Sequence, residues 1–129
     1  MNVAPGQTLV TLGLIVTVPD SVPVRFTIGA VTSGAKGVLF YDESGTIQHM
    51  PSLQVPAEKI IDTSGAGDVF HGAYCADYLE NPQASWRAHF EFARAASAHK
   101  IQHLGNEAGL PTEEDVEAAR EAFPEAAES

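Results

Sequence analysis

The segment that most constrains this chain runs from Ile60 to Ala73. Two β-branched residues, Ile60 and Ile61, favour an extended backbone. Residues 62–68 then read Asp-Thr-Ser-Gly-Ala-Gly-Asp, which favours a turn of small residues, and a helix-like stretch follows. A helix that begins after such a turn presents free N–H groups and the positive end of its macrodipole. The segment therefore predicts an anion site at the junction, and phosphate is the usual anion.

Asp68 falls inside this predicted anion site. A carboxylate is a poor choice where the only task is to hold phosphate. It makes chemical sense where the group must take a proton from a hydroxyl that attacks the phosphate. The alternative is that Asp68 only complements the dipole at a helix N-terminus, and the residues alone leave both interpretations open.

Composition narrows the classes of partner and compartment. The 129 residues carry a formal net charge of −10, which argues against nucleic acid or an anionic membrane as a partner. Cys75 is the single cysteine, so no internal disulfide can form, and we expect it to be a small core residue in a reducing, cytoplasmic setting. The longest apolar run, 9–18, is too short to span a membrane, and no basic residue precedes Arg25 as a signal peptide would need.

The periodicity and the turn signals predict an α/β domain. We expect β-prone runs at 9–13 and 14–18, a hairpin, and three helices. The predicted hairpin strands are 38–41 and 46–50, and the predicted helices are 67–80, 85–103 and 112–123. Ser85 and Thr112 are the candidate N-caps of the second and third helices.

A longer pattern adds a family resemblance. The signature at 62–73, together with Thr32-Ser33-Gly34-Ala35-Lys36-Gly37, resembles the ribokinase-like (PfkB-type) carbohydrate kinases. The resemblance covers residues 31–123 and implies the C-terminal part of an αβα sandwich with a mainly parallel sheet and a β-hairpin. Residues 1–30 match poorly, and 124–129 form an acidic tail. Val10-Thr11-Leu12-Gly13 is nearly repeated at 31–34. One hypothesis is that part of 14–30 is an insertion or a gene-model artefact. The alternative is an ordinary strand pair whose similarity arises by chance.

The resemblance also implies roles for individual residues. It makes Asp68 the catalytic base and the backbone of Gly65, Ala66 and Gly67 an anion hole. The residues it assigns to the nucleotide are Thr32, Gly34, Gly37 and Arg94. Those it assigns to a monovalent cation site, mostly through backbone oxygens, are Asp62, Ser64, Lys100, His103, Gly105 and Gly109. From the residues alone, the alternative for Asp62 is a turn-capping carboxylate.

The implied activity is phosphorylation of a sugar or sugar-like hydroxyl by ATP, with Mg²⁺ and, in some members, K⁺. ATP and a small carbohydrate are the implied partners, and a homodimer is compatible with the resemblance. Ribose, fructose, a keto-deoxy sugar acid and a nucleoside all suit the signature. The sugar-binding motif of the family's N-terminal half is absent from this sequence. The alternative function is therefore a truncated nucleotide-binding fragment or interaction module without turnover.

Overall fold

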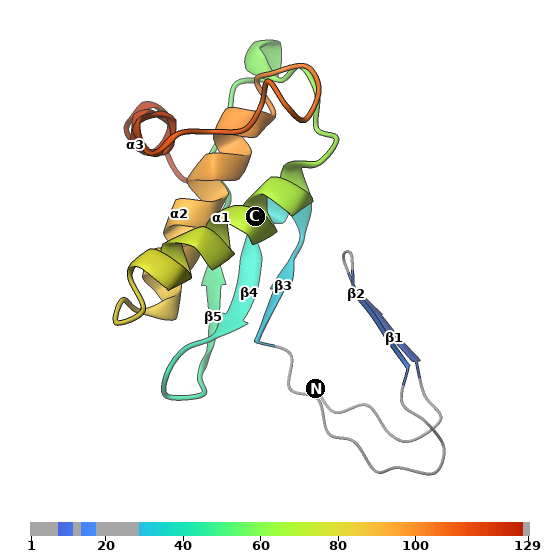
Figure 1. Cartoon of the computed structure of the whole chain (residues 1–129), viewed down its shortest axis with the longest axis vertical. Coiled ribbons are helices and arrows are strands. Elements are labelled where there is room, and N and C mark those ends of the chain that lie inside the picture. The colour runs from blue at the N-terminus through green and yellow to red at the C-terminus, as the bar shows by residue number, and fades with distance from the viewer. Residues whose placement is uncertain (1–7, 12–13, 18–28, 128–129) are drawn as a thin grey trace.

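The computed structural model describes residues 8–11, 14–17 and 29–127 (Figure 1). Its elements, in chain order, are β1 (Thr8–Thr11), β2 (Leu14–Thr17), β3 (Ala30–Thr32), η1 (Gly34–Lys36), β4 (Val38–Tyr41), β5 (Ile47–Met50), η2 (Ala57–Lys59), α1 (Ala66–Glu80), α2 (Trp86–Lys100) and α3 (Glu113–Ala122). No helix within these ranges is both long and apolar enough to cross a bilayer.

The strands form two antiparallel groups. The β-prone runs expected at 9–13 and 14–18 form β1 and β2, which pair with each other, and β3, β4 and β5 form a separate sheet in that order. The predicted hairpin is confirmed as β4–β5. The mainly parallel sheet is not found among the described strands, because parallel neighbours need a long crossover between them and no α-helix separates β3, β4 and β5.

The hairpin turn is built by one side chain. Asp42 Oδ1 accepts hydrogen bonds from the backbone N–H groups of Ser44 and Thr46, both at 2.9 Å. Gly45 completes the turn with a φ of 79°. Hydrogen bonds from Ser44, Thr46 and Gln48 lower the pKa of Asp42 to about 2. This local network sets the register of β4 against β5.

Ile60 and Ile61 do not form the predicted strand. The backbone leaves η2 at Lys59 and runs without regular structure to residue 63. The N–H groups of Ile61 and Asp62 both donate to the carbonyl of Ile101, at 2.8 and 3.2 Å. The donors that a strand would offer to a sheet are therefore used by the end of α2.

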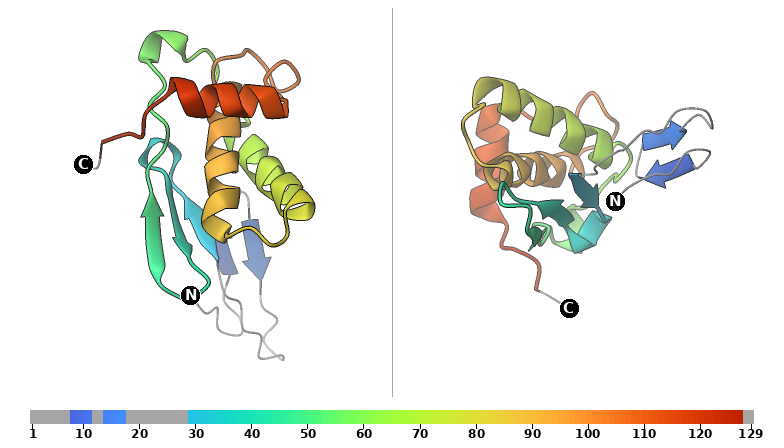
Figure 2. Two further views of the ribbon diagram at one scale, coloured as in Figure 1. Left: turned by 90° about the vertical axis from the view of Figure 1, so that its left-hand side faces the viewer. Right: turned by 90° about the horizontal axis from the view of Figure 1, so that it is seen from below.

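One face of the β3–β5 sheet packs on helices. Figure 2 shows α1, α2 and α3 on the same side of the sheet, so the described residues supply one helical layer of the expected sandwich. Val38, Phe40 and Met50 point into this layer and pack against Phe90 of α2. Alternate residues point the other way, and the large apolar side chains exposed on that face are Val31, Leu39 and Ile47.

The recurrence of Val69, Ala73, Ala76 and Leu79 at three- and four-residue intervals predicts one apolar face on α1, and the structure packs only the first half of it, Val69 and Ala73. Val69 is buried. Phe70 and Tyr74 pack against the sheet-side core cluster, which consists of Val38, Phe40, Met50 and Phe90. Leu79, which we expected on the apolar face, is 78% exposed. Cys75 is also exposed rather than in the core, because α1 is covered on one side only.

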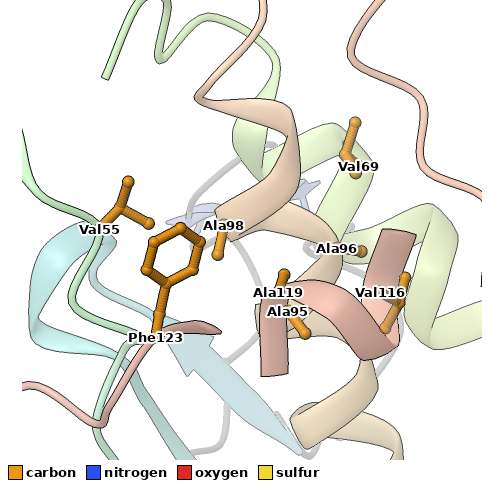
Figure 3. Close-up of a cluster of buried hydrophobic side chains, with 8 residues drawn as sticks. All are labelled: Val55, Val69, Ala95, Ala96, Ala98, Val116, Ala119 and Phe123. Atoms are coloured by element: carbon orange, nitrogen blue, oxygen red, sulfur yellow. The ribbon is translucent and has the colours of Figure 1, made fainter. Parts of the chain in front are cut away.

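Helix α3 closes a second core across the C-terminal half of α2. Figure 3 shows Phe123 and Ala119 beside Ala95 and Ala98 of α2. The predicted caps are confirmed. Ser85 Oγ accepts the N–H of Ala88 at 3.2 Å, and Thr112 forms a capping box with Asp115. These caps fix where α2 and α3 begin.

Candidate functional site

The start of α1 is shaped by Gly65. This residue is the N-cap and has a φ of 74°, in the left-handed region that glycine adopts readily. A Cβ placed on Gly65 would lie 2.2 Å from Oδ1 of Asn106. A glycine is therefore required here both by the turn and by the loop that follows α2.

Helix α2 anchors this turn. Ser97 Oγ donates to the carbonyl of Ala66 at 2.6 Å. One turn further along, the carbonyl of Ile101 accepts the N–H groups of Ile61 and Asp62, which lie in the irregular segment before α1. The first turn of α1 is thus held to α2 on both sides, and a pre-organised N-terminus is what an anion site needs.

Asp68 lies in the first turn of α1 and is exposed, as is Gly67. The N–H of Ala66 donates to Thr63 O at 3.3 Å. The N–H groups of Gly67 and Asp68 belong to the first helical turn, which offers them no intrahelical acceptor. A carboxylate beside open N–H donors is the arrangement that the sequence predicts.

Asp62 caps the turn, as its alternative interpretation predicts. Oδ1 accepts the N–H of Ser64 at 2.9 Å, and Oδ2 accepts the N–H of Gly105 at 3.0 Å. These two hydrogen bonds, with further ones from the Ser64 and Lys100 side chains, hold the pKa of the Asp62 carboxyl well below its usual range. Asp62 thereby links the loop before α1 to the loop after α2.

Four other residues of the predicted cation site lie around the same junction. Lys100 ends α2, and its side chain is fully buried. Its ammonium group is 3.1 Å from Asp62 O and 3.5 Å from His103 O. Gly105 has a φ of 79° and reaches Asp62, and Gly109 packs against Lys100. The structure therefore brings these residues together, but with a side-chain cation among them.

The predicted nucleotide loop follows β3. Thr32 is the last residue of that strand, and Gly34 begins η1. Gly37 has a φ of 93°, and a Cβ there would lie 2.0 Å from the carbonyl of Met50. Ser52 Oγ supports the loop by donating to Ala35 O at 2.6 Å. The loop and the start of α1 lie toward the same end of the molecule (Figure 1).

Arg94, the predicted adenosine neighbour, ties three segments together. Its guanidinium donates to Pro51 O and to Glu125 Oε1, both at 2.7 Å. Its side chain is 14% exposed. The adenosine contact stays a prediction, and the structure adds a role in holding the C-terminal segment to α2.

Sequence reasoning did not single out Ser97 or Asn106 as residues of this site. Ser97 is one of several small residues on α2, and only the three-dimensional structure shows that its hydroxyl meets Ala66. Asn106 comes from a loop forty-one positions after Gly65. Neither lies within a pattern of local spacing, so the only available signal was a polar residue among small ones in α2.

The described residues contain no group of three or more His, Cys, Asp or Glu side chains that could hold a metal ion. His99 and His103 stack with ring centroids 4.3 Å apart, and His103 Nδ1 bonds to His99 O. A Mg²⁺ ion is commonly held by substrate phosphates with one or two carboxylates. Within the part of the chain that the structure describes, no three-ligand protein cage is therefore present for it.

Comparisons with known proteins place these features in a family. The model of the pfkB family carbohydrate kinases matches residues 27–113. A ribokinase of Lactococcus lactis is 38% identical over 88 residues, which are 68% of this chain and 27% of that protein. A cytidine kinase of Thermococcus kodakarensis is 44% identical over 48 residues, 37% of this chain and 16% of that protein.

A solved structure matches the fold. The Arabidopsis thaliana ribokinase complexed with ribose and ATP has a TM-score of 0.61 and 26% identity, over 70% of this chain and 28% of the other. This chain thus spans less than a third of the length of the relatives it matches. The partial ribokinase-like fold is confirmed. The family model covers more than half of the sequence, and so the chain belongs to the pfkB family of carbohydrate kinases.

Proposed function

We propose that the chain carries the base and the anion-binding turn for phosphoryl transfer from ATP to a hydroxyl of a sugar or nucleoside. The observation that carries the proposal is the exposed Asp68 in the first turn of α1, directly after the left-handed Gly65. The family membership supports it, as does the complex of the Arabidopsis relative with ribose and ATP.

In the proposed reaction the acceptor oxygen attacks the γ-phosphorus of ATP. An O–P bond forms, the bond from the γ-phosphorus to the bridging oxygen breaks, and ADP leaves. Asp68 takes the hydroxyl proton onto its carboxylate. The N–H groups of the 65–67 turn stabilise the negative charge on the transferring group. The hydrogen bond from Ser97 to Ala66 keeps that turn in place while the charge moves.

The nucleotide side of the proposal rests on the loop after β3. Thr32, Gly34 and Gly37 are the proposed nucleotide contacts, and the exposed Lys36 lies among them. The tight turn leaves the backbone bare, and glycines allow a phosphate to approach closely. Mg²⁺ is expected to arrive with the nucleotide, and no step here depends on a protein ligand for it.

The test is a coupled kinase assay on the full chain, with ribose and cytidine as acceptors. Asp68→Asn should lower kcat by about 10²–10⁴-fold, the usual contribution of a general base. ATP affinity and the melting temperature should hardly change, because Asp68 is exposed. The control is Glu114→Gln, which removes the same charge from the first turn of α3 and should leave turnover unchanged.

Turnover that survives Asp68→Asn would refute the assignment of the base. ATP binding without turnover in the wild type would favour the second candidate, a nucleotide-binding fragment or interaction module. The observation that favours this candidate is that the chain matches only a short part of its relatives, 27% of the Lactococcus lactis ribokinase. The remaining length of such a protein would have to supply the acceptor pocket.

A further inference from the structure

The ammonium group of Lys100 is buried where the signature loop meets the end of α2. The side chain has no exposed surface. Its Nζ lies 3.1 Å from Asp62 O, 3.4 Å from Asp62 Oδ2 and 3.5 Å from His103 O. Three oxygens thus face the three N–H donors of the ammonium group. A buried charge persists only when it is paired in this way.

These oxygens belong to the residues predicted to bind a monovalent cation. A bound K⁺ would need free lone pairs from Asp62 and His103. The ammonium already points at both, and the Asp62 carboxylate also accepts N–H groups from Ser64 and Gly105. A second unit positive charge at the same oxygens would be repelled by the first. The residues present therefore do not fit a K⁺ ion alongside Lys100.

Gly109 shows that the loop is shaped around the lysine stem. A Cβ on Gly109 would lie 3.0 Å from Cγ of Lys100 and 3.2 Å from the carbonyls of Lys100 and Gly105. Gly109 is itself buried. The absence of a side chain at this position makes room for the aliphatic part of Lys100. Both the head and the stem of the lysine are accommodated, which argues for a fixed position.

We propose that Lys100 is a covalently attached replacement for the monovalent cation. Its ammonium group joins Asp62, in the loop before α1, to His103, in the loop after α2. The turn that leads to Asp68 would then keep its conformation without K⁺. The further expectation that turnover is independent of K⁺ rests on the proposed function. The structural role of Lys100 does not.

The test compares melting temperatures of the full chain in KCl and in choline chloride at equal ionic strength. The wild type should melt at the same temperature in both salts. Lys100→Ala removes the ammonium and opens space, so it should melt at a lower temperature in choline chloride and recover part of the loss in KCl. Lys100→Met keeps the stem without the charge and should melt at the same lowered temperature in both salts.

A K⁺-specific rise in the melting temperature of the wild type would overturn the proposal, and this arm needs no variant. The proposal would also fail if Lys100→Ala responded to K⁺ no more than Lys100→Met. Because melting does not depend on turnover, a chain without kinase activity can still pass this test. A failure of the proposed function is therefore distinguishable from a failure of this inference.

Discussion

Replacing Gly65 with alanine tests whether the turn before α1 is shaped by both its backbone and its neighbour. The φ of 74° lies in the left-handed region, which costs an alanine about 1–2 kcal/mol. Alanine also lowers the conformational entropy of the unfolded chain, which offsets about 0.4–1 kcal/mol of this cost. The new Cβ would also lie 2.2 Å from Oδ1 of Asn106. Moving that side chain off its rotamer adds about 0.5–1.5 kcal/mol.

Two further variants separate these contributions. Gly34 also has a positive φ, of 53°, but a Cβ there meets nothing within 4 Å. Gly34→Ala should therefore show the backbone cost alone. Gly65→Ala should cost more than Gly34→Ala by the contribution from Asn106. That excess should disappear when Gly65→Ala is made in an Asn106→Ala background.

Urea denaturation followed by the fluorescence of Trp86, the single tryptophan, measures each free energy of unfolding. Trp86 packs against the sheet-side core cluster, so its emission reports loss of that core. A coupling free energy of zero between positions 65 and 106 would refute the packing described here. An equal cost for Gly65→Ala and Gly34→Ala would refute it as well.

Three other predictions concern stability. Phe123→Ala should lower the free energy of unfolding by about 3–5 kcal/mol, because it empties a buried site between α2 and α3, and urea denaturation would show whether the loss is that large. Thr112→Ala should cost about 0.5–2 kcal/mol through loss of the capping box, with Thr112→Ser near neutral as its control in thermal melts. The folded-state pKa values of Asp42 and Asp62 are lowered, so both carboxyls stabilise the fold above their unfolded pKa of about 3.9, and this is lost as the pH falls from there. Acid titration followed by circular dichroism should show this decline, and Asp62→Asn should reduce it.

Local signals account for the parts of the structure that sequence could predict. The cap at Ser85, the capping box at Thr112 and the turn at Asp42 each involve residues two to four positions apart, so the pattern is visible in the chain. The turn and helix at 65–80 are likewise encoded by adjacent small residues. The turn at Gly65 and the helix that follows place Asp68 in the first turn of α1, as predicted.

The features that sequence could not predict depend on distant partners. Ile60 and Ile61 have strand-forming side chains, but their backbone partner is Ile101. The buried stripe of α1 depends on which side α2 and the sheet cover, which its apolar residues alone do not encode. Lys100 carries no local mark of burial either, since its acceptors come from Asp62 and from the loop at 103.

Helix α2 packs against most of the other elements among the described residues, and this should determine the rates of amide hydrogen exchange. It packs on α1, on α3 and on the sheet, and its buried residues run from His89 to Lys100. Its central amides should therefore exchange with solvent deuterium only when the whole domain unfolds, whereas the exposed C-terminal half of α1 can open locally. The N–H groups of Ile61 and Asp62, which both donate to Ile101 at the end of α2, should exchange more slowly than the open N–H groups of Gly67 and Asp68 in the turn proposed to bind an anion.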